Sequence, residues 1–484
     1  MEMFIDGGWT PAVSGATQPV TNPTTGAVVD TVPTGDERDA DLAIRAADRA
    51  LAGWRSTPVA ERARLQRRAA QLMRDNAERI GRALTAELGR PVAAAITEIQ
   101  RSADLLDVYA EEGLRLHSEI ISGAPGEKIL VTREPVGVVV AITPFNYPIT
   151  LLCFKLGAAL IAGCTVVAKP AEDTPTSTLM LAELFHQAGF PPGCFNVVTG
   201  RGRGIGMAMV NHPIPGKIAF TGGTAAGKAI AAAAAGTMKR VTLELGGQSP
   251  AIICADADLA KAAAAIARHG FANSGQFCYR VNRVYVERPA YDAFLTALLA
   301  EVAKITIGDG QSQPVTLGPM VNAKIFGNAY GQIGDARDKG ARICCGGERL
   351  SGGIYDAGYF LPPTVIADTD HSMKIMTEET FGPVLGIMPV DSPAEALRLA
   401  NDTDYGLAGF VFSGHTGRGL ALAERINAGS VWVNDIHRSN HSAPFGGMKQ
   451  SGLGREKGRY GVESYLEYKT IYLTYDESLD EGLE

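Results

Sequence analysis

Two kinds of hydrophobic spacing divide the chain. Between residues 36 and 89, and again at 92–112, apolar side chains recur every three or four positions. This spacing predicts amphipathic helices that bury one face. From 129 to 286, short apolar runs alternate with helical stretches, which is typical of parallel βαβ units with helices on both faces of a sheet.

The elements of this alternating region follow a regular order. We expect strands at 136–142, 165–168, 196–198 and 217–220, and helices at 148–163, 174–189 and 224–235. A second α/β region is expected from 251 to 445, with a helix at 259–271, joined to the first at Gly246-Gly247. The stretch 464–475 is predicted to be one strand that must find a sheet edge elsewhere, followed by a frayed acidic tail at 476–484.

Composition narrows the possible partners. The chain has 484 residues and a net charge of −7 with no basic domain, which argues against nucleic acid. Seven cysteines without a C-x-x-C pair indicate a reduced, intracellular protein. The acidic N-terminus lacks a signal-peptide pattern, and the longest apolar stretch, 156–168, is too short to cross a bilayer. We therefore expect a cytoplasmic protein with no membrane partner.

A glycine-rich loop follows one predicted strand and opens a helix. Residues 222–228 (GGTAAGK) resemble a nucleotide-binding P-loop, but Ala229 stands where a Ser or Thr should hold Mg²⁺. An NTPase is therefore disfavoured. A helix N-terminus here could still bind a dinucleotide pyrophosphate, and an ordinary glycine-bearing turn is the alternative. The segment 200–204 (GRGRG) does not have the G-x-G-x-x-G spacing.

Several polar residues lie where a ligand would meet them. Lys169 and Glu172 follow a strand end and suit ribose hydroxyls, or form a solvated turn. Glu244, before Gly-Gly, suits a general base or a water-facing strand position. Cys278 has an arginine two residues later that would favour its thiolate, although a lone cysteine is more often buried and inert. Asn146 could stabilise an oxyanion or simply precede a turn proline.

The eight histidines do not have metal-ligand spacing. His437 and His441 are four residues apart, but Ser, Asn and Arg surround them and Pro444 follows. We predict a loop at this point and no metal site.

Together and in this order, seven segments resemble one family. They are 143–148 (TPFNYP), 169–172 (KPAE), 220–224 (FTGGT), 243–247 (LELGG), 275–278 (GQFC), 378–384 (EETFGPV) and 444–452 (PFGGMKQSG). The chain resembles the NAD(P)-dependent aldehyde dehydrogenase superfamily over essentially its whole length.

The resemblance implies an aldehyde-dehydrogenase-like α/β fold with two parallel-sheet, Rossmann-like domains and a small β oligomerisation arm. It places an NAD-binding domain at 1–116 and 136–246, a catalytic domain at 247–455 and the arm at 117–135 and 456–484. By the same analogy, the terminal strand at about 464–474 is expected to pair with a neighbouring subunit, which implies a homodimer or a homotetramer.

The resemblance also implies a chemistry. Cys278 would attack the aldehyde, and Asn146 would hold the oxyanion together with the Cys278 backbone N–H. Glu244 would activate the water that hydrolyses the thioester. The resemblance gives Lys169 two expected roles, one among these catalytic residues and one in binding the ribose. Because relatives that use coenzyme A lack the glutamate, its presence favours a free carboxylic acid as product.

NAD is the expected cofactor, because a carboxylate at Glu172 would repel the 2′-phosphate of NADP. Gly223 stands where many relatives have Ser, so the backbone must supply that phosphate contact. The family's cofactor contacts correspond to Thr143, Pro144, Phe145, Lys169, Glu172, Gly202, Phe220, Thr221, Gly222, Gly223, Thr224, Gly227, Leu245, Gly246, Glu379 and Phe381.

The substrate is expected to be an aromatic or medium-length apolar aldehyde, because aromatic side chains dominate the expected tunnel. The tunnel residues are Tyr147, Leu151, Phe154, Phe277, Tyr279, Arg280 and Phe445. Phe154 stands where the succinic semialdehyde branch has an Arg. Arg280 and the loop 436–441 could pair with a distant anion, although an ion pair within the fold is favoured for Arg280. The alternatives are a semialdehyde dehydrogenase and a non-catalytic member of the same fold.

Overall fold

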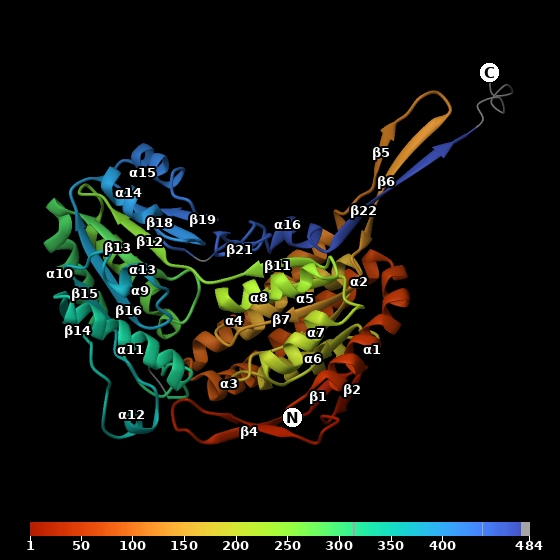
Figure 1. Ribbon diagram of the computed structural model, residues 1–484, viewed down its shortest axis with the longest axis horizontal. Helices are drawn as coiled ribbons and strands as arrows, with labels where there is room; N and C mark the ends of the chain where they lie inside the picture. Colours follow the sequence, from red (N-terminus) through yellow and green to blue (C-terminus); the bar gives the residue numbers. More distant parts are fainter. Residues whose placement is uncertain (313–314, 438, 476–484) are drawn as a thin grey trace.

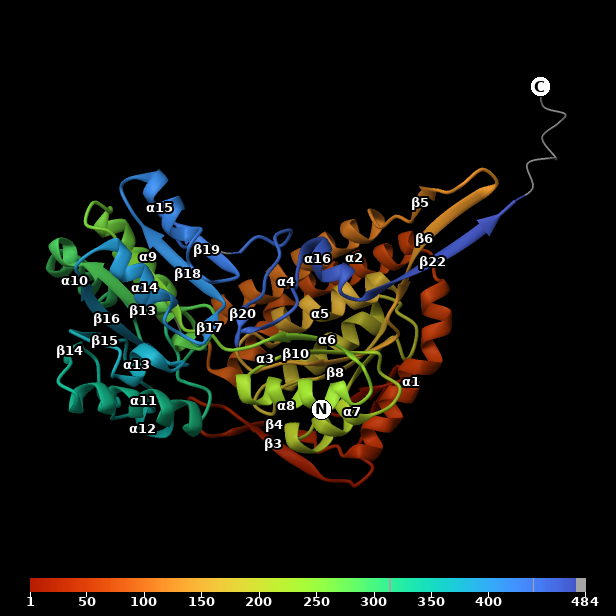
Figure 2. The same cartoon turned by 45° about the horizontal axis from the view of Figure 1, so that its top comes forward.

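The computed structural model describes residues 1–312, 315–437 and 439–475. Two α/β bodies lie side by side, and a three-stranded sheet projects beyond the first of them (Figures 1 and 2). The acidic tail expected at 476–484 lies outside the described residues. The mixed α/β architecture with parallel sheets expected from the sequence is confirmed.

The first body is built on an eight-stranded sheet with the order β2-β1-β9-β8-β7-β10-β11-β21. Five neighbouring strands, from β9 to β11, are parallel. The strands are β1 (Met3–Ile5), β2 (Gly8–Thr10), β7 (Val138–Ile142), β8 (Thr165–Lys169), β9 (Phe195–Val197), β10 (Lys217–Thr221), β11 (Arg240–Glu244) and β21 (Gly452–Leu453).

Helices cover both faces of this sheet. Successive side chains of a strand point to opposite faces, so each buried strand contributes to two apolar cores. On β7, Val139 and Ala141 pack into one apolar core, and Val138, Val140 and Ile142 pack into another. The helices of this body are α1 (Glu37–Ser56), α2 (Val59–Asp75), α3 (Ala77–Leu88), α4 (Val92–Leu114), α5 (Pro148–Ala162), α6 (Thr176–Gln187), the π-helix η1 (Gly202–Gly206), α7 (Met207–Asn211), α8 (Thr224–Ala235) and α16 (Gly458–Glu463).

Local sequence explains where these helices begin and end. The helical stretch expected at 36–89 is three helices, because Pro58 and Asn76 stand at their junctions and a proline disfavours helical backbone in the residue before it. Asp36 begins α1 with a capping box. Pro148 opens α5, and Gly163 closes it at φ 96°.

The second body is built on a seven-stranded sheet with the order β14-β15-β16-β13-β12-β18-β19. Its strands are β12 (Ser249–Ile253), β13 (Val281–Glu287), β14 (Arg342–Cys345), β15 (Thr364–Ala367), β16 (Val384–Val390), β18 (Ala408–Phe412) and β19 (Ser430–Val433). Its helices are α9 (Leu259–Phe271), the 3₁₀ turns η2 (Ala272–Gly275) and η3 (Arg288–Ala290), α10 (Tyr291–Val302), α11 (Ala323–Asp338), α12 (Ile354–Ala357), α13 (Lys374–Thr377), α14 (Pro393–Asn401) and α15 (Thr416–Ala423).

Two short strand pairs complete the bodies. They are β3 (Thr17–Thr21) with β4 (Val28–Pro33), and β17 (Tyr405–Gly406) with β20 (Met448–Lys449). None of the described helices is long and apolar enough to cross a membrane.

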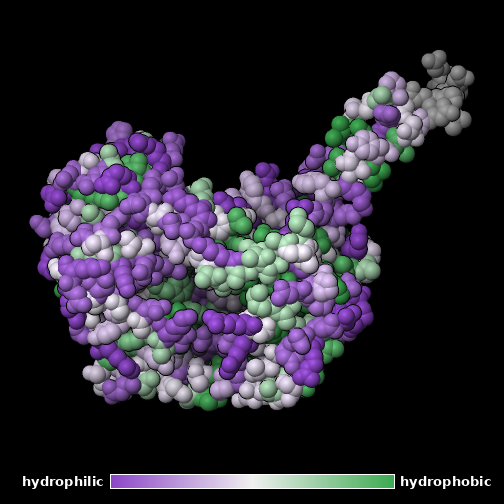
Figure 3. All heavy atoms as spheres, viewed as in Figure 1, coloured by the Kyte–Doolittle hydropathy of each residue, from purple (hydrophilic) through white to green (hydrophobic). Residues whose placement is uncertain are grey.

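The projecting sheet pairs β22 (Leu466–Thr474) with β6 (Glu127–Pro135), which in turn pairs with β5 (Glu119–Ser122). The lone strand expected at 464–475 therefore pairs with β6 of its own chain, whereas pairing with a neighbouring subunit was expected. The preceding α16 packs on α4 and α5, so the sheet begins ten residues later than the boundary expected at 456. Ile120 and Tyr472 of this sheet are exposed, and hydrophobic residues are visible on the projecting part of the molecule in Figure 3.

Candidate active site

A cavity of about 210 Å³ lies where the strand ends of the first body face the second body, and a recess is visible between the bodies in Figure 3. The sequence-predicted residues that line it are Pro144, Phe145, Asn146, Leu151, Thr221, Gly222, Gly223, Glu244, Leu245, Gly246, Cys278, Glu379 and Phe381. Ile325 and Asn328 of α11 complete the lining, and the sequence reading had not singled them out.

The thiol, the amide and the carboxylate expected to react come together in this cavity. Glu244 ends β11, Asn146 follows β7, and Cys278 follows η2. Both carboxylate oxygens of Glu244 and the amide oxygen of Asn146 are buried with no hydrogen-bond partner among the described residues. Buried polar atoms are normally satisfied, so these three oxygens face a place where a ligand or water belongs.

The backbone just before Cys278 is strained, and specific contacts hold it in this conformation. Asn273 and Ser274 have φ values of 50° and 56°, which non-glycine residues rarely adopt. Asn273 Nδ2 donates to the carbonyl oxygen of Asn146 at 3.0 Å and thereby joins the two bodies. A Cβ at Gly275 would collide with the backbone of Gly382, so only glycine fits there.

The electrostatics of the cavity disfavour negative charge. Burial raises the pKa of the Cys278 thiol well above its usual value, and the carboxylates of Glu244 and Glu379 raise it further. Burial and then Glu456 raise the pKa of Glu244 well above its usual value. Burial raises the pKa of Glu379 to about 7. The site therefore favours a positively charged group close to the sulfur.

Behind Glu244 lies a buried ion pair that the sequence reading missed. Lys155 Nζ donates to Glu456 Oε1 at 2.7 Å and to Thr221 Oγ1 at 2.6 Å. Lys155 lowers the pKa of Glu244, against the effects of burial and Glu456. The available signal was a single lysine within the otherwise apolar helix α5, because a charge there must find a partner.

The other side of the cavity suits a dinucleotide. The N-terminus of α8 at Gly223 has no side-chain cap, and a Cβ built on Gly223 would meet nothing within 4 Å. The unpaired N–H groups at such a helix end bind phosphate. A Cβ at Gly246 would meet the Glu379 carboxylate, which accepts from Gly247 N at 3.0 Å. These residues therefore fit the expected cofactor.

The predicted ribose residues lie at the adjacent strand end and do not line the cavity with Cys278. Burial lowers the pKa of Lys169 to about 8, against the effect of Glu172, and Lys169 Nζ donates to the Pro170 carbonyl at 2.9 Å. Glu172 accepts from Gly202 N at 3.0 Å. This position places Lys169 with the expected cofactor contacts and apart from the reactive group.

The remaining cofactor candidates divide between ligand-facing and packing positions. A Cβ at Gly227 would clash with Leu245, so this glycine lets α8 pack closely on β11. Thr143 and Phe220 are buried. Phe381 contacts Phe145 edge to face at 5.8 Å between ring centroids, across the two bodies.

Five aromatic residues expected in the substrate tunnel form one cluster beside the cavity. The centroid distances are 6.2 Å for Tyr147–Phe277, 5.2 Å for Phe277–Tyr279, 5.5 Å for Tyr279–Phe445 and 6.2 Å for Phe154–Phe445. These edge-on contacts bring together residues from the loop before α5, from α5 itself and from the second body.

Arg280 does not belong to the tunnel, and this expectation was wrong. Its side chain is fully buried and donates to the carbonyl oxygens of Thr380, Gly270, Val281 and Val384 at 2.7–3.2 Å. The guanidinium thus ties α9 and β13 to β16. Because all four contacts are to backbone carbonyls, the favoured alternative, an ion pair within the fold, was also wrong. Arg438 of the predicted loop lies outside the described residues.

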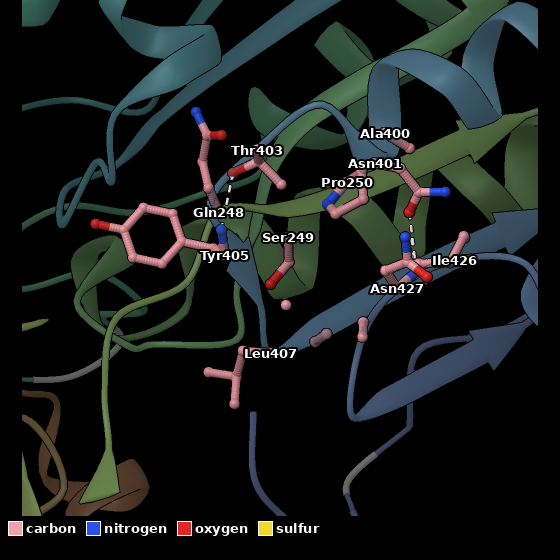
Figure 4. A pocket seen from close by; sticks show the side chains of 13 residues that line it. Gln248, Ser249, Pro250, Ala400, Asn401, Thr403, Tyr405, Leu407, Ile426 and Asn427 are labelled. Atoms are coloured by element: carbon pink, nitrogen blue, oxygen red, sulfur yellow. Dashed lines mark hydrogen bonds between the residues drawn. The ribbon is translucent and has the colours of Figure 1, made fainter. Parts of the chain in front are cut away.

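A second, much smaller cavity lies inside the second body (Figure 4). It holds about 10 Å³, room for roughly one water molecule. Gln248 Oε1 and Ser249 Oγ are buried there without a partner among the described residues. It is too small for an aldehyde substrate, and no cysteine, histidine or carboxylate lines it.

Comparison with known proteins identifies the class. Residues 9–471 match the model of the aldehyde dehydrogenase family. The chain therefore belongs to this family, as its motifs indicated, and its relatives are oxidoreductases that act on aldehyde groups.

The names of similar proteins state particular substrates and cofactors. The chain is 41% identical to the glutarate-semialdehyde dehydrogenase of Pseudomonas aeruginosa over 98% of this chain and 97% of that protein. It is 40% identical to the NADP(+) succinate-semialdehyde dehydrogenase of Escherichia coli, covering 97% and 96%. The betaine aldehyde dehydrogenase of Staphylococcus aureus, solved in complex with NAD+, superposes with a TM-score of 0.95 at 35% identity, covering 98% and 95%.

Replacing Arg280 with Met should destabilise the protein. Four backbone carbonyls would lose their donor, and we expect a loss of about 3 kcal/mol, measured as a lower urea midpoint. The exposed Arg288, paired with Asp391, supplies the control: Arg288→Met should change stability by less than about 1 kcal/mol. A raised KM with unchanged stability would return Arg280 to the substrate site.

Proposed function

We propose that this chain oxidises a short aldehyde carrying a distal carboxylate, a semialdehyde, to the dicarboxylate, with NAD as the electron acceptor. The observation that carries the proposal is the cavity in which Cys278, Asn146 and Glu244 meet beside the N-terminus of α8. The substrate class is supported by relatives named for glutarate and succinate semialdehydes.

This substrate replaces the aromatic or medium-length apolar aldehyde expected from the aromatic tunnel. The named relatives favour the alternative reading, a semialdehyde dehydrogenase. The aromatic side chains still have a role, because they exclude water and line the path of a short methylene chain. A non-catalytic role has less support, since the thiol and its unpartnered polar neighbours share one cavity.

The first half of the proposed reaction takes place on Cys278. Its sulfur attacks the aldehyde carbon, and the Asn146 amide stabilises the oxyanion of the resulting thiohemiacetal. The nicotinamide, when bound, supplies a hydride acceptor and a positive charge. Loss of hydride converts the thiohemiacetal into a thioester on Cys278. Gly223, Gly246 and Glu379 are the residues that would hold the cofactor.

Hydrolysis completes the reaction. Glu244 removes a proton from water, the water oxygen attacks the thioester carbon, and the sulfur leaves. Aldehyde, NAD+ and water thus become carboxylate, NADH and two protons. Because burial and Glu456 raise the pKa of Glu244, its basic form depends on the positive charge of Lys155, which lowers that pKa. The buried pairing with Glu456 holds the lysine in place.

The preference for NAD rests on Glu172. Its carboxylate accepts a hydrogen bond from the N–H of Gly202, at the start of η1, beside the place expected for the adenosine ribose. A 2′-phosphate there would meet a like charge. The named relatives include one that uses NADP(+) and one solved with NAD+.

Two substitutions test the mechanism. Cys278→Ala should reduce NADH production at least about 10³-fold, because no covalent intermediate can form, while NAD binding measured by calorimetry persists.

Glu244→Gln should release one equivalent of NADH per site in a stopped-flow burst and then stall, because the thioester cannot be hydrolysed. Steady turnover by either variant at the wild-type rate would contradict the assigned role.

The charge of Glu172 can be tested separately. Glu172→Gln should raise the ratio of kcat/KM for NADP to that for NAD by about tenfold or more, because a like-charge repulsion disappears. The adjacent Asp173, whose partner is Asn322, supplies the matched control Asp173→Asn. An unchanged ratio in Glu172→Gln would remove this residue from cofactor selection.

We also propose that the projecting arm joins two or more copies of the chain. Its exposed Ile120, Ile471 and Tyr472 form the kind of apolar surface that soluble proteins normally cover. A chain ending at Leu466 keeps the buried Tyr465 in place but removes β22 beyond its first residue. We expect it to elute as a monomer in size-exclusion chromatography with light scattering, whereas an oligomer of unchanged mass would refute this role.

A further inference from the structure

Lys457 is a buried cation that the proposed mechanism does not use. Its side chain is 1% exposed. Within the described residues, no carboxylate oxygen lies within ion-pair distance of its ammonium, since neighbouring Glu456 is paired with Lys155. Among the described residues, the ammonium of Lys457 makes one hydrogen bond, in which Nζ donates to Ser439 Oγ at 2.6 Å. An ammonium has three donors, so this group can accept further partners.

The backbone at Lys457 is as unusual as its burial. Its φ is 70° and its ψ is 158°, a conformation that glycine adopts freely and other residues adopt at a cost. The position carries a lysine although glycine would relax the backbone and remove a buried charge. Strain of this kind concentrates at ligand-binding and active sites.

The ammonium lies against the aromatic cluster. It is 5.1 Å from the ring centroid of Phe154 and 4.8 Å from that of Phe445. Phe445 in turn contacts Tyr279, the neighbour of Cys278. The positive charge therefore lies against the aromatic residues expected to guide the substrate. Lys457 itself is not among the residues that line the cavity with Cys278. Arg101 of α4 is close by, with Nη2 donating to the Ser439 carbonyl at 3.5 Å.

We propose that Lys457, with the Ser439 hydroxyl beside it, binds the distal anionic group of the aldehyde while the aldehyde carbon meets Cys278. This inference rests on the proposed function and names the residue that selects its substrate class. A carboxylate would receive a charge-assisted hydrogen bond from the ammonium and would neutralise a buried charge that has no other counterion at contact distance.

The inference also accounts for Phe154. An aromatic residue there, where the semialdehyde branch has an Arg, had counted against a carboxylate-bearing substrate. The ammonium of Lys457 lies over that same ring, so the wall carries a positive charge from another segment of the chain. The cation–π contact holds the ammonium in place without consuming its donors.

Recognition by Lys457 should weaken in alkaline solution. Burial lowers the pKa of Lys457 to about 8, and Arg101 lowers it further, against the carboxylates of Glu456 and Glu244 and the thiol of Cys278. His441 also faces the lysine. A bound anion would raise the lysine pKa, so affinity for the anion should fall as pH rises above about 8.

The test compares an anionic and a neutral substrate on the same variants. Lys457→Gly suits the backbone, and Lys457→Met keeps most of the length of the side chain without its charge. Lys449 also has a positive φ, 52°, and its Nζ binds the carbonyls of Asn401 and Thr403, so Lys449→Gly is the matched control. Glutaric semialdehyde and pentanal have the same number of carbons and differ in the distal carboxylate.

We expect the ratio of kcat/KM for glutaric semialdehyde to that for pentanal to fall at least tenfold in both Lys457 variants, mainly through KM. Lys457→Arg should restore part of the ratio, and Lys449→Gly should not change it. An equal loss for both substrates would mean that Lys457 serves Cys278 or Glu244 and not the distal anion, and an unchanged ratio would mean that it has no role in selection. Either outcome overturns the inference.

Glutarate binding separates this inference from the proposed function, because the dicarboxylate has the anion but no aldehyde. Calorimetry should detect binding to the wild-type chain that weakens at least tenfold in Lys457→Gly. If the wild type oxidises no aldehyde yet binds glutarate through Lys457, the proposed reaction fails and the anion site stands. If glutarate binds equally to both proteins, the inference fails whatever the activity. Thermal unfolding checks that Lys457→Gly remains folded.

Discussion

The buried ion pair between Lys155 and Glu456 is the constraint around which the active-site wall is arranged. Its two residues are 301 positions apart in sequence, and their charged atoms lie 2.7 Å apart with both side chains almost completely buried. Leaving one partner alone in such a place typically costs about 3–5 kcal/mol. The pair therefore requires the segment after β21 to lie against α5, and this placement brings Lys457 to the aromatic cluster.

The same low-dielectric environment governs the chemistry. Burial raises the pKa values of Cys278, Glu244 and Glu379, so the site resists negative charge until positive groups are near. Lys155 supplies a positive charge behind Glu244. In the proposed mechanism the nicotinamide supplies a second one, and Lys457 supplies a third one on the substrate side. A nucleophile that stays protonated until the site is filled is protected from side reactions with solvent species.

Much of the fold could be predicted, because hydrophobic periodicity reports which faces of an element are buried. The strand expected at 217–220 appears as β10, and the helix expected at 259–271 appears as α9. The single helical region at 36–89 was less accurate, since breaks at Pro58 and Asn76 depend on local backbone geometry. The residues of the candidate site were found through ordered motifs, and the structure brings half of them, including Cys278, Asn146 and Glu244, to one cavity.

What the sequence by itself determined was the class of elements, the family and the identity of the reactive side chains, because these depend on local spacing and on short motifs. Only the tertiary structure decided which charges face the substrate. Arg280, two residues from the nucleophile, turns inward to backbone carbonyls, whereas Lys457, in a segment that resembles an ordinary solvated turn, is buried against Phe154 and Phe445. The direction of a long side chain depends on partners that are distant in sequence, and no local pattern records them.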